Sequence, residues 1–346
     1  MEERKNIIQF QNTLQLPKDS VRSMVEWEGK LVSAHGDGGV YITTESESKQ
    51  LWKEHCFAVT IWNGNLACGG CDVISIWNSD EKCIMEVKGN TDSIWCLVEW
   101  NEYLVSGSGD KTIQIWDRNG KCQITMNQHS GTVRCLVVWK DNLVSGSNDK
   151  TIMIWNIKGD CLMKLTEHTD RIHSLAVYND NLVSGSDDKT IQIWSKDGKC
   201  IQVLKGHTEG ILTLLEWNEY LISADFDENV RVWNERGHCL HEMKAGRALA
   251  VWNSKLACGS ASAKNIQVYQ LVSQWKSGIF MSKTLKFRCT LFISKKISIG
   301  SEDFDDNCIK RYNHPQSHSK GHPISHFSIL VSIFLSLYCQ LGRIVK

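Results

Sequence analysis

The sequence predicts an all-β fold built from a tandem repeat. Four tryptophans recur at a fixed interval of 39 residues, and they are Trp116, Trp155, Trp194 and Trp233. Each closes a similar string, of which LVSGSDDKTIQIW, ending at Trp194, is one copy. Only three prolines occur in 346 residues, and none lies between Pro17 and Pro315, so backbone donors for sheet ladders are retained throughout the repeats. A fixed period of this size marks a repeat architecture.

Within each repeat, short runs rich in β-branched and aromatic residues are bounded by Gly, Asp and Asn, which is typical of strands and turns. In the repeat that ends at Trp155, the runs LVSGS and TIMIW are followed by DCLMKL. No long apolar stripe with a helical period interrupts them. We count seven groups of strands, whose third strands end near Thr43, Trp77, Trp116, Trp155, Trp194, Trp233 and Tyr269.

The last group lacks an obvious fourth strand after Tyr269. The segment IIQFQNTLQL, which starts at Ile7, precedes the first group and fits the position of a fourth strand. We therefore expect it to pair with the last group and to close the seven groups into a ring. Such closure removes exposed sheet edges.

The pattern of a histidine, a tryptophan about ten residues later and then SGSxDKTIxIW resembles that of the WD-repeat β-propeller family, most specifically in four consecutive repeats. Each repeat of that family forms a four-stranded blade. The resemblance implies a seven-bladed β-propeller over residues 7–270, closed by the N-terminal strand. Residues 271–346 are expected to be an irregular C-terminal extension with a degenerate repeat, a polar linker and an apolar tail. The repeats are also similar to the propellers of F-box proteins and of myosin-heavy-chain-kinase-type kinases.

The resemblance further implies a hydrogen-bonded set of His, Ser, Asp and Trp inside each regular blade. Buried polar groups need partners, and these four side chains together supply donors and acceptors. The complete sets are His129, Ser145, Asp149 and Trp155; His168, Ser184, Asp188 and Trp194; and His207, Ser223, Asp227 and Trp233. A catalytic triad is not predicted, because a triad is needed once whereas this set recurs at a fixed interval.

The other blades depart from this set, and we expect blades one, two and seven to be the less regular part of the ring. No aspartate aligns in blade seven. The substituted positions are Thr43 in blade one, Trp52 and Cys68 in blade two, Asn90 in blade three, and Cys258 and Tyr269 in blade seven.

Charge and cysteine usage narrow the classes of function. The 39 basic and 39 acidic residues cancel, which argues against a strong nucleic-acid footprint. Cys68 and Cys71 form the only C-x-x-C pair, and without a second pair no metal or cofactor is expected. The absence of a recognisable signal peptide and the unpaired cysteines predict a cytoplasmic protein. Five of the 14 cysteines recur at 39-residue intervals at the start of the fourth strand and are expected to be buried: Cys83, Cys122, Cys161, Cys200 and Cys239.

The C-terminal extension has two further features. Four histidines fall four residues apart, but the nearby prolines and glycine favour a solvated linker over a metal-binding helix; they are His314, His318, His322 and His326. A continuous apolar run extends from Phe327 to Leu341 and is shorter than the roughly 20 residues of a membrane-spanning helix. It is open to three interpretations: a short membrane anchor, a segment packed on the propeller, and a non-native tail.

Binding residues are expected on the face that carries the loops between blades, which is the usual contact surface of the family. There, residues at repeated positions vary from blade to blade while the framework does not, and Arg and aromatic side chains are enriched at interface hot spots. The predicted protein-binding residues are Arg22, Phe57, Trp95, Arg134, Arg171, His173, Asp187, Phe226 and Arg247.

The arginines among these residues suggest an acidic partner. The guanidinium groups of Arg22, Arg134 and Arg247 could bind a carboxylate- or phosphate-bearing peptide. Some F-box-linked propellers bind phosphopeptides with arginines at the position of Arg134. The neighbouring blades carry Trp95 and His173 at that position, which argues against phosphopeptide specificity.

These observations predict a non-catalytic scaffold or adaptor that binds a protein or peptide on the loop face. One alternative is a substrate-recruiting subunit acting in trans with a ubiquitin ligase or kinase, since the chain has no F-box or kinase motif. Another is a membrane-tethered adaptor held by the apolar tail. An enzyme would need a non-repeating cluster of acid, base or metal-ligating residues, and no such cluster is evident. No small-molecule substrate is expected, and nucleic-acid binding would require stacking on Trp95 and Phe57 beside a basic groove.

Overall fold

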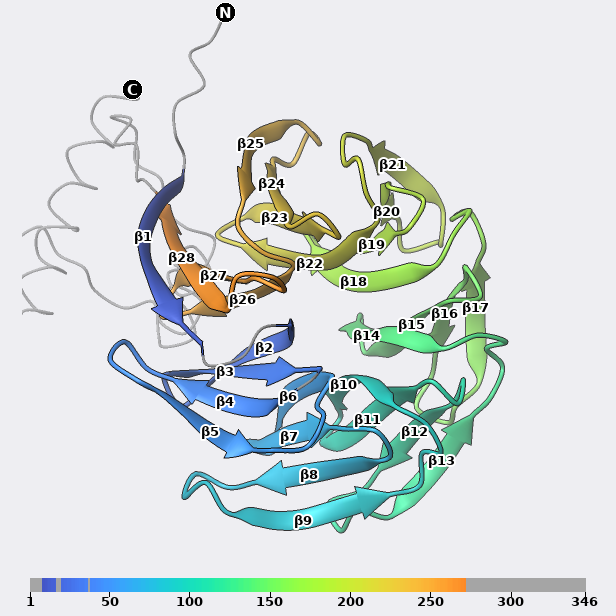
Figure 1. Ribbon diagram of the computed structural model, residues 1–346. Helices are drawn as coiled ribbons and strands as arrows, with labels where there is room; N and C mark the ends of the chain where they lie inside the picture. The colour runs from blue at the N-terminus through green and yellow to red at the C-terminus, as the bar shows by residue number, and fades with distance from the viewer. Residues whose placement is uncertain (1–7, 17–19, 37, 272–346) are drawn as a thin grey trace, which may run out of the picture. The chain divides into compact units, whose positions relative to one another are not determined.

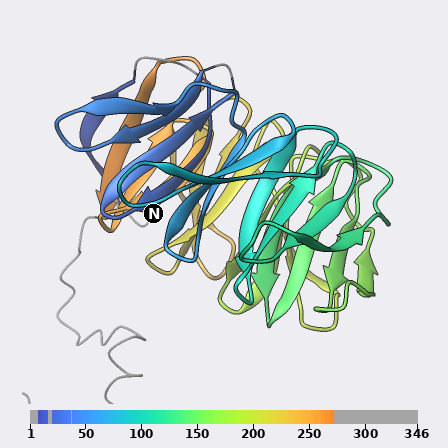
Figure 2. The ribbon, with the colours of Figure 1, turned by 90° about the horizontal axis from the view of Figure 1, so that it is seen from below.

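The computed structural model describes residues 8–16, 20–36 and 38–271, which form seven four-stranded antiparallel sheets around a central axis (Figure 1). In six of the sheets the first strand in the chain is innermost and the fourth lies at the rim. Figure 2 shows the same sheets from the side, standing next to one another around the ring. All regular secondary structure in this part of the chain is β-strand, so it holds no helix that could span a membrane. The predicted all-β, seven-bladed propeller is confirmed.

The blades follow one another in chain order. The strands of blades one and two are β2 (Val21–Trp27), β3 (Lys30–His35), β4 (Gly39–Thr43), β5 (Ser48–Trp52), β6 (Ala58–Trp62), β7 (Asn65–Gly69), β8 (Val73–Trp77) and β9 (Cys83–Lys88). Those of blades three and four are β10 (Ile94–Trp100), β11 (Tyr103–Ser108), β12 (Ile113–Trp116), β13 (Cys122–Met126), β14 (Val133–Trp139), β15 (Asn142–Ser147), β16 (Ile152–Trp155) and β17 (Cys161–Leu165). Those of blades five and six are β18 (Ile172–Tyr178), β19 (Asn181–Ser186), β20 (Ile191–Trp194), β21 (Cys200–Leu204), β22 (Ile211–Trp217), β23 (Tyr220–Asp225), β24 (Asn229–Trp233) and β25 (Cys239–Lys244). Blade seven combines β26 (Ala248–Trp252), β27 (Lys255–Gly259) and β28 (Asn265–Leu271) with β1 (Ile8–Gln15) from the start of the chain.

The N-terminal strand closes the ring as predicted. β1 pairs antiparallel with β28, so that Ile8 lies opposite Leu271 and Gln15 opposite Asn265. Leu14 and Leu16 are buried against blade seven and the first strand of blade one. The strand therefore covers the edge of β28 and also seals the contact between the last blade and the first.

Inside blades four and five, the recurring set of His, Ser, Asp and Trp side chains forms one continuous chain of hydrogen bonds, which we call the latch. In blade four the indole N–H of Trp155 donates to Ser145 Oγ at 2.8 Å, and the Ser145 hydroxyl lies 2.7 Å from His129 Nε2. His129 Nδ1 lies 2.8 Å from Asp149 Oδ2 and donates to it. Burial raises the pKa of Asp149, but hydrogen bonds from His129 and Thr151 outweigh this and hold the pKa well below its usual range. Blade five repeats the chain with Trp194, Ser184, His168 and Asp188.

Blade six builds its latch from a different aspartate than the one predicted. His207 Nδ1 lies 2.8 Å from Asp225 Oδ2, whereas Asp227 is exposed and only donates its backbone N–H to Asp225. The assignment of Asp227 to the latch is therefore wrong. Asp225 ends β23 at the position where blades four and five have Ser147 and Ser186, and its carboxylate reaches the imidazole directly from there.

The irregular blades replace the latch in different ways. In blade three Asn90 stands in for histidine, because it accepts the hydroxyl proton of Ser106 at 2.9 Å while Trp116 donates to that same hydroxyl. In blade two, where Cys68 replaces serine, the buried indole N–H of Trp77 has no hydrogen-bond partner among the described residues. The asparagine substitution thus keeps the latch, and the cysteine substitution breaks it.

The cysteines that start the fourth strands are not buried, contrary to expectation. Cys83 and Cys239 are exposed, and Cys122, Cys161 and Cys200 are half-buried. Each Sγ lies 3.4–3.5 Å from the carbonyl oxygen two residues further along. The reason is their place at the rim, where the fourth strand has no neighbour on its outer edge.

A second set of aromatic residues, not recognised in the sequence, links neighbouring blades. Each donates from its indole or phenol group to a carbonyl in the first turn of the next blade, at 2.9–3.2 Å. These turns have positive φ at two successive residues, as at Asn179 and Asp180, which is the geometry of type I′ hairpins. We call these seven bonds the clasp; the donors are Trp27, Trp62, Trp100, Trp139, Tyr178, Trp217 and Trp252. Because Trp252 donates to Gly29 of blade one, the clasp is closed around the ring.

We expect Trp252→Phe to lower the free energy of unfolding by about 1–2 kcal/mol more than Trp77→Phe does. The first substitution removes a hydrogen bond between the last blade and the first, whereas the second removes a buried donor that has no partner. Urea unfolding followed by tryptophan fluorescence measures both. Equal losses would contradict a stabilising role for the clasp.

Candidate functional site

The predicted binding residues of the inner strands occupy β-bulges. In blade four, Val133 pairs with Ser147 and Cys135 with Gly146, so Arg134 has no partner on the second strand. The same shift occurs once in each of four further blades, at Arg22, Trp95, His173 and Leu212. A bulge takes one residue out of the ladder and redirects its side chain. These side chains are therefore free of the packing that keeps the rest of the strand uniform, which accounts for their variation.

Phe57 and Arg247 take the equivalent place in blades two and seven without a bulge. Each lies directly before its inner strand and donates its backbone N–H to the glycine that ends the second strand, Phe57 to Gly69 and Arg247 to Gly259, at 2.9 and 3.0 Å. The seven residues form what we call the loop-face ring: Arg22, Phe57, Trp95, Arg134, His173, Leu212 and Arg247.

Three consecutive blades contribute to one stack within this ring. The rings of Phe57 and Trp95 are 4.9 Å apart, and the guanidinium carbon of Arg134 lies 4.0 Å from the centre of a Trp95 ring. Arg134 Nε also donates to Asn148 Oδ1 at 3.1 Å. The guanidinium is thus held on one face and at one nitrogen, a cation–π geometry that orients its remaining N–H groups.

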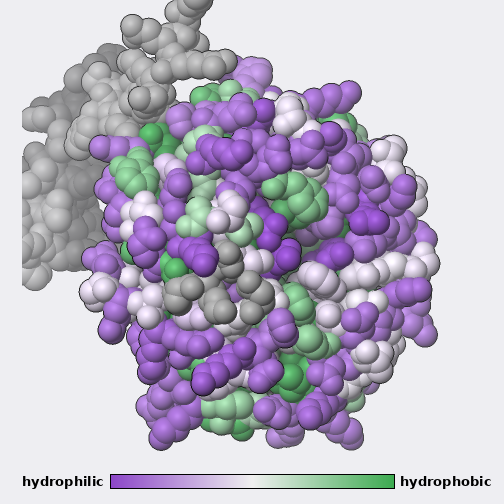
Figure 3. Space-filling model, viewed as in Figure 1, coloured by the Kyte–Doolittle hydropathy of each residue, from purple (hydrophilic) through white to green (hydrophobic). Residues whose placement is uncertain are grey.

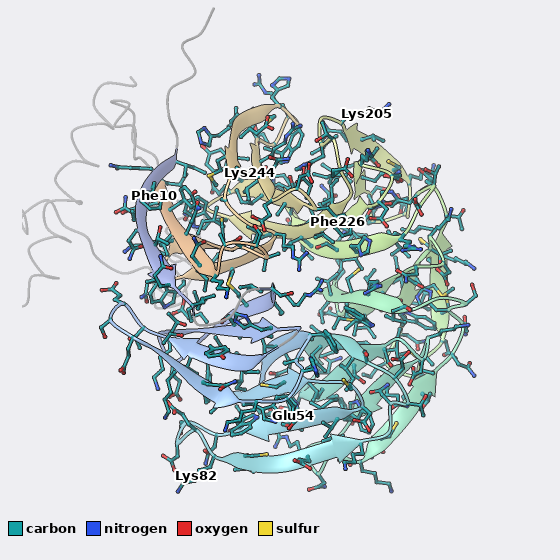
Figure 4. The ribbon with its side chains drawn as sticks, in the orientation of Figure 1. Phe10, Glu54, Lys82, Lys205, Phe226 and Lys244 are labelled. Carbon is teal, nitrogen blue, oxygen red and sulfur yellow. The ribbon has the colours of Figure 1, made fainter. Side chains whose placement is uncertain are left out.

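Blades five and six supply a second cluster. His173 packs edge-on against Phe226 at 5.6 Å, and its Nε2 lies 2.9 Å from Asp187 Oδ1. Burial lowers the pKa of His173 and outweighs the opposing effect of Asp187. Phe226 remains 45% exposed and lies near the inner strands, as Figure 4 shows. Asp187 and Phe226 are held by backbone bonds to Arg171 and Gly210, so the predicted flanking residues adjoin the ring.

Four arginines share one electrostatic environment although they come from four blades. Burial lowers the pKa of Arg134, and the positive charges of Arg171 and Arg22 lower it further. Burial and the charge of Arg22 likewise lower the pKa of Arg247. Within the described part of the chain, none of these four arginines forms an ion pair with a carboxylate. The charges of Asp187 and Glu228 partly offset these effects on Arg134 and Arg247, but neither carboxylate forms an ion pair with them.

The surroundings of the ring limit what it can bind. The face seen in Figure 3 is largely hydrophilic, with separate hydrophobic side chains rather than one broad apolar patch. Among the residues that the structure describes, no three His, Cys, Asp or Glu side chains are grouped to hold a metal ion. The tail histidines and the apolar run from Phe327 to Leu341 lie outside the described residues.

Comparisons with known proteins agree with the repeat and the fold. The family model described as "WD domain, G-beta repeat" matches residues 81–117, 120–156, 159–195 and 198–234. Among solved structures, the WD40 beta propeller domain of Doa1 is similar, with a TM-score of 0.68 and 21% sequence identity over 78% of this chain and 98% of that chain. A comparison with curated proteins gives no match.

The likeness to Doa1 concerns the fold, since an identity of 21% carries no function from one chain to the other. Propellers of this kind generally serve as scaffolds for protein interactions. Four blades match the family in sequence, and all seven have its architecture. The chain is a seven-bladed β-propeller that carries four WD-domain repeats.

Proposed function

We propose that this propeller is an adaptor that binds a peptide or protein partner on the loop-face ring. The observation that carries the proposal is the bulge in five inner strands, which frees one side chain per blade from strand packing. Bulges are frequent next to functional sites because they redirect side chains. The residues placed there include arginine and tryptophan, the types that contribute most to binding hot spots.

The partner segment carries a carboxylate or a phosphate. Arg134 is already oriented by Trp95 and Asn148, so little conformational freedom would be lost when its free N–H groups bind an oxyanion. Arg22, Arg171 and Arg247 add positive charge that no described carboxylate pairs with. Phe226, with its exposed ring, offers an apolar contact beside His173.

No catalytic role is proposed, because each short His–Asp contact in the described residues has another explanation. Three of them belong to latches inside blades four, five and six. The fourth joins His173 and Asp187 on the ring, and among the described residues no serine or cysteine forms a hydrogen bond with this imidazole. Binding rather than turnover is the activity that this arrangement supports.

The proposal is tested by affinity purification and mass spectrometry of the tagged full chain. The ring variant carries Arg22→Glu, Arg134→Glu and Arg247→Glu. A matched control carries Lys82→Glu, Lys121→Glu and Lys158→Glu, which make the same charge change at exposed turns of the opposite face. We expect specific partners to fall by about tenfold or more with the ring variant and to persist with the control, because reversed charge at an interface repels an acidic partner. Unchanged partners in a folded ring variant would place the binding surface elsewhere.

A further inference from the structure

The loop of residues 260–264 in blade seven is held by a carboxylate from blade six. Glu228 accepts hydrogen bonds from the backbone N–H groups of Ala261 at 2.7 Å and Ser262 at 3.2 Å. The hydroxyls of Ser260 and Ser262 donate to the same carboxylate at 3.0–3.3 Å. Two backbone donors and two hydroxyls thus converge on one oxyanion in a blade that has no aspartate of its own in this turn.

The backbone of Glu228 holds the other segment that leads to the ring. Its carbonyl accepts the N–H groups of Ala245 and Gly246 at 3.0 and 3.3 Å, directly before Arg247. Gly246 lies so close to blade seven that a Cβ added there would be 2.6 Å from the carbonyl oxygen of Gly259. Arg247 in turn donates its N–H to Gly259. Glu228 therefore contacts both backbone segments that flank Arg247.

The same position in blades four and five carries a lysine. Lys150 and Lys189 have positive φ values of 70° and 68°, close to the 64° of Glu228. Each lysine reaches the next blade and donates to one backbone carbonyl, of Thr169 or Thr208. Glu228 also contacts the next blade, but with a negatively charged side chain. Its partners there are hydrogen-bond donors, whereas the partners of the lysines are carbonyl acceptors.

We propose that Glu228 is a positioning residue that fixes Arg247 in the loop-face ring, and that the loop of residues 260–264 is an oxyanion receptor with Glu228 as its resident ligand. The role of Arg247 in binding rests on the proposed function, whereas the receptor does not. The negative charge of Glu228 also offsets the effects of burial and of Arg22 on the Arg247 guanidinium. One carboxylate thereby affects both the position of this ring residue and the electrostatic potential around it.

The receptor is tested by amide hydrogen exchange on the full chain with Glu228→Ala, using formate as the probe. We expect amides of residues 259–263 to exchange about tenfold faster or more than in the native chain, because Ala261 and Ser262 lose their charge-assisted hydrogen bonds to the carboxylate. Amides of residues 245–247 are expected to follow, since Arg247 donates its N–H to Gly259 beside the loosened loop. Formate is small enough to enter the space left by the side chain and is expected to restore the protection. Amides of blades three and four should not change.

Two further variants make the result decisive. Glu228→Gln keeps the shape of the side chain and is expected to give an intermediate exchange rate, so it serves if the alanine variant does not fold. Lys189→Ala, the matched control in blade five, removes two exposed contacts, to the Thr208 carbonyl and the Glu209 carboxylate, and is expected to change exchange in the next blade by less than about twofold. Unchanged exchange in both Glu228 variants, or an alanine variant indifferent to formate, would overturn the proposal.

The partners recovered in the affinity purification separate this proposal from the proposed function. Glu228→Ala is expected to reduce the recovery of partners as much as Arg247→Ala does. If Arg247→Ala leaves all partners bound, the assignment of Arg247 to the binding surface fails, while the exchange experiment still decides whether Glu228 positions it.

Discussion

Asp225→Ala is expected to lower the free energy of unfolding by about 3–5 kcal/mol, because it leaves a buried polar partner unpaired. The carboxylate of Asp225 is fully buried and accepts hydrogen bonds from His207 and from the backbone N–H groups of Asp227 and Asn229. Its loss leaves the His207 imidazole, 2.8 Å away, without its acceptor. Urea unfolding followed by tryptophan fluorescence measures the change.

Asp227→Ala is the matched control for this experiment. Its side chain is exposed, and exposed substitutions usually change stability by less than about 0.5 kcal/mol. A larger loss for Asp227→Ala than for Asp225→Ala would restore the assignment made from the repeat alignment and contradict the geometry. Both substitutions remove one carboxylate from nearly the same place. Comparing them therefore distinguishes the loss of the latch hydrogen bond from a general effect of charge.

Deleting residues 1–16 is expected to leave no stable monomeric ring. The deletion uncovers the edge of β28 and removes the buried side chains of Ile8, Leu14 and Leu16. Burial of side chains of this size contributes about 1.5–3 kcal/mol each, so the loss is comparable with the whole stability of many proteins. Size-exclusion chromatography and thermal unfolding should show aggregation or a midpoint lowered by more than about 10 °C.

A peptide of residues 8–16 added in trans is expected to recover part of the lost stability, because it can pair with the free edge of β28. Thr13→Ala in the full chain is the control, since this residue of β1 is exposed. A truncated chain that stays monomeric with an unchanged midpoint would show that β1 is dispensable for closure.

Much of the fold could be predicted from the repeat in the sequence. A period of 39 residues placed the strands of blades three to six, because each blade repeats the same local pairing with the same turn residues. It also located the latches of blades four and five, whose partners stand at fixed offsets within one blade. The N-terminal strand could be assigned because the last blade lacked a fourth strand and one was left over at the start of the chain.

Aligning the repeats gave wrong predictions where a contact depends on the exact position and length of a side chain. Asp225 and Asp227 are both acidic and only two residues apart, and only the fold shows which of them meets His207. The cysteines of the fourth strands repeat regularly, but regular spacing does not tell a buried strand from one at the rim. Asn90 was counted as a departure, although an amide can fill the place of the imidazole in the latch.

The sequence by itself determined the number of blades, the order of their strands and the positions at which residues vary. Only the tertiary structure decided why those positions vary, since the bulge at Arg134 depends on how two strands pair. It also decided which residues join one blade to the next, as Trp252 does with Gly29 and Glu228 with the loop of residues 260–264. The physical reason is that a repeat records hydrogen bonding within a blade, whereas contacts between blades join residues whose spacing along the chain carries no local pattern.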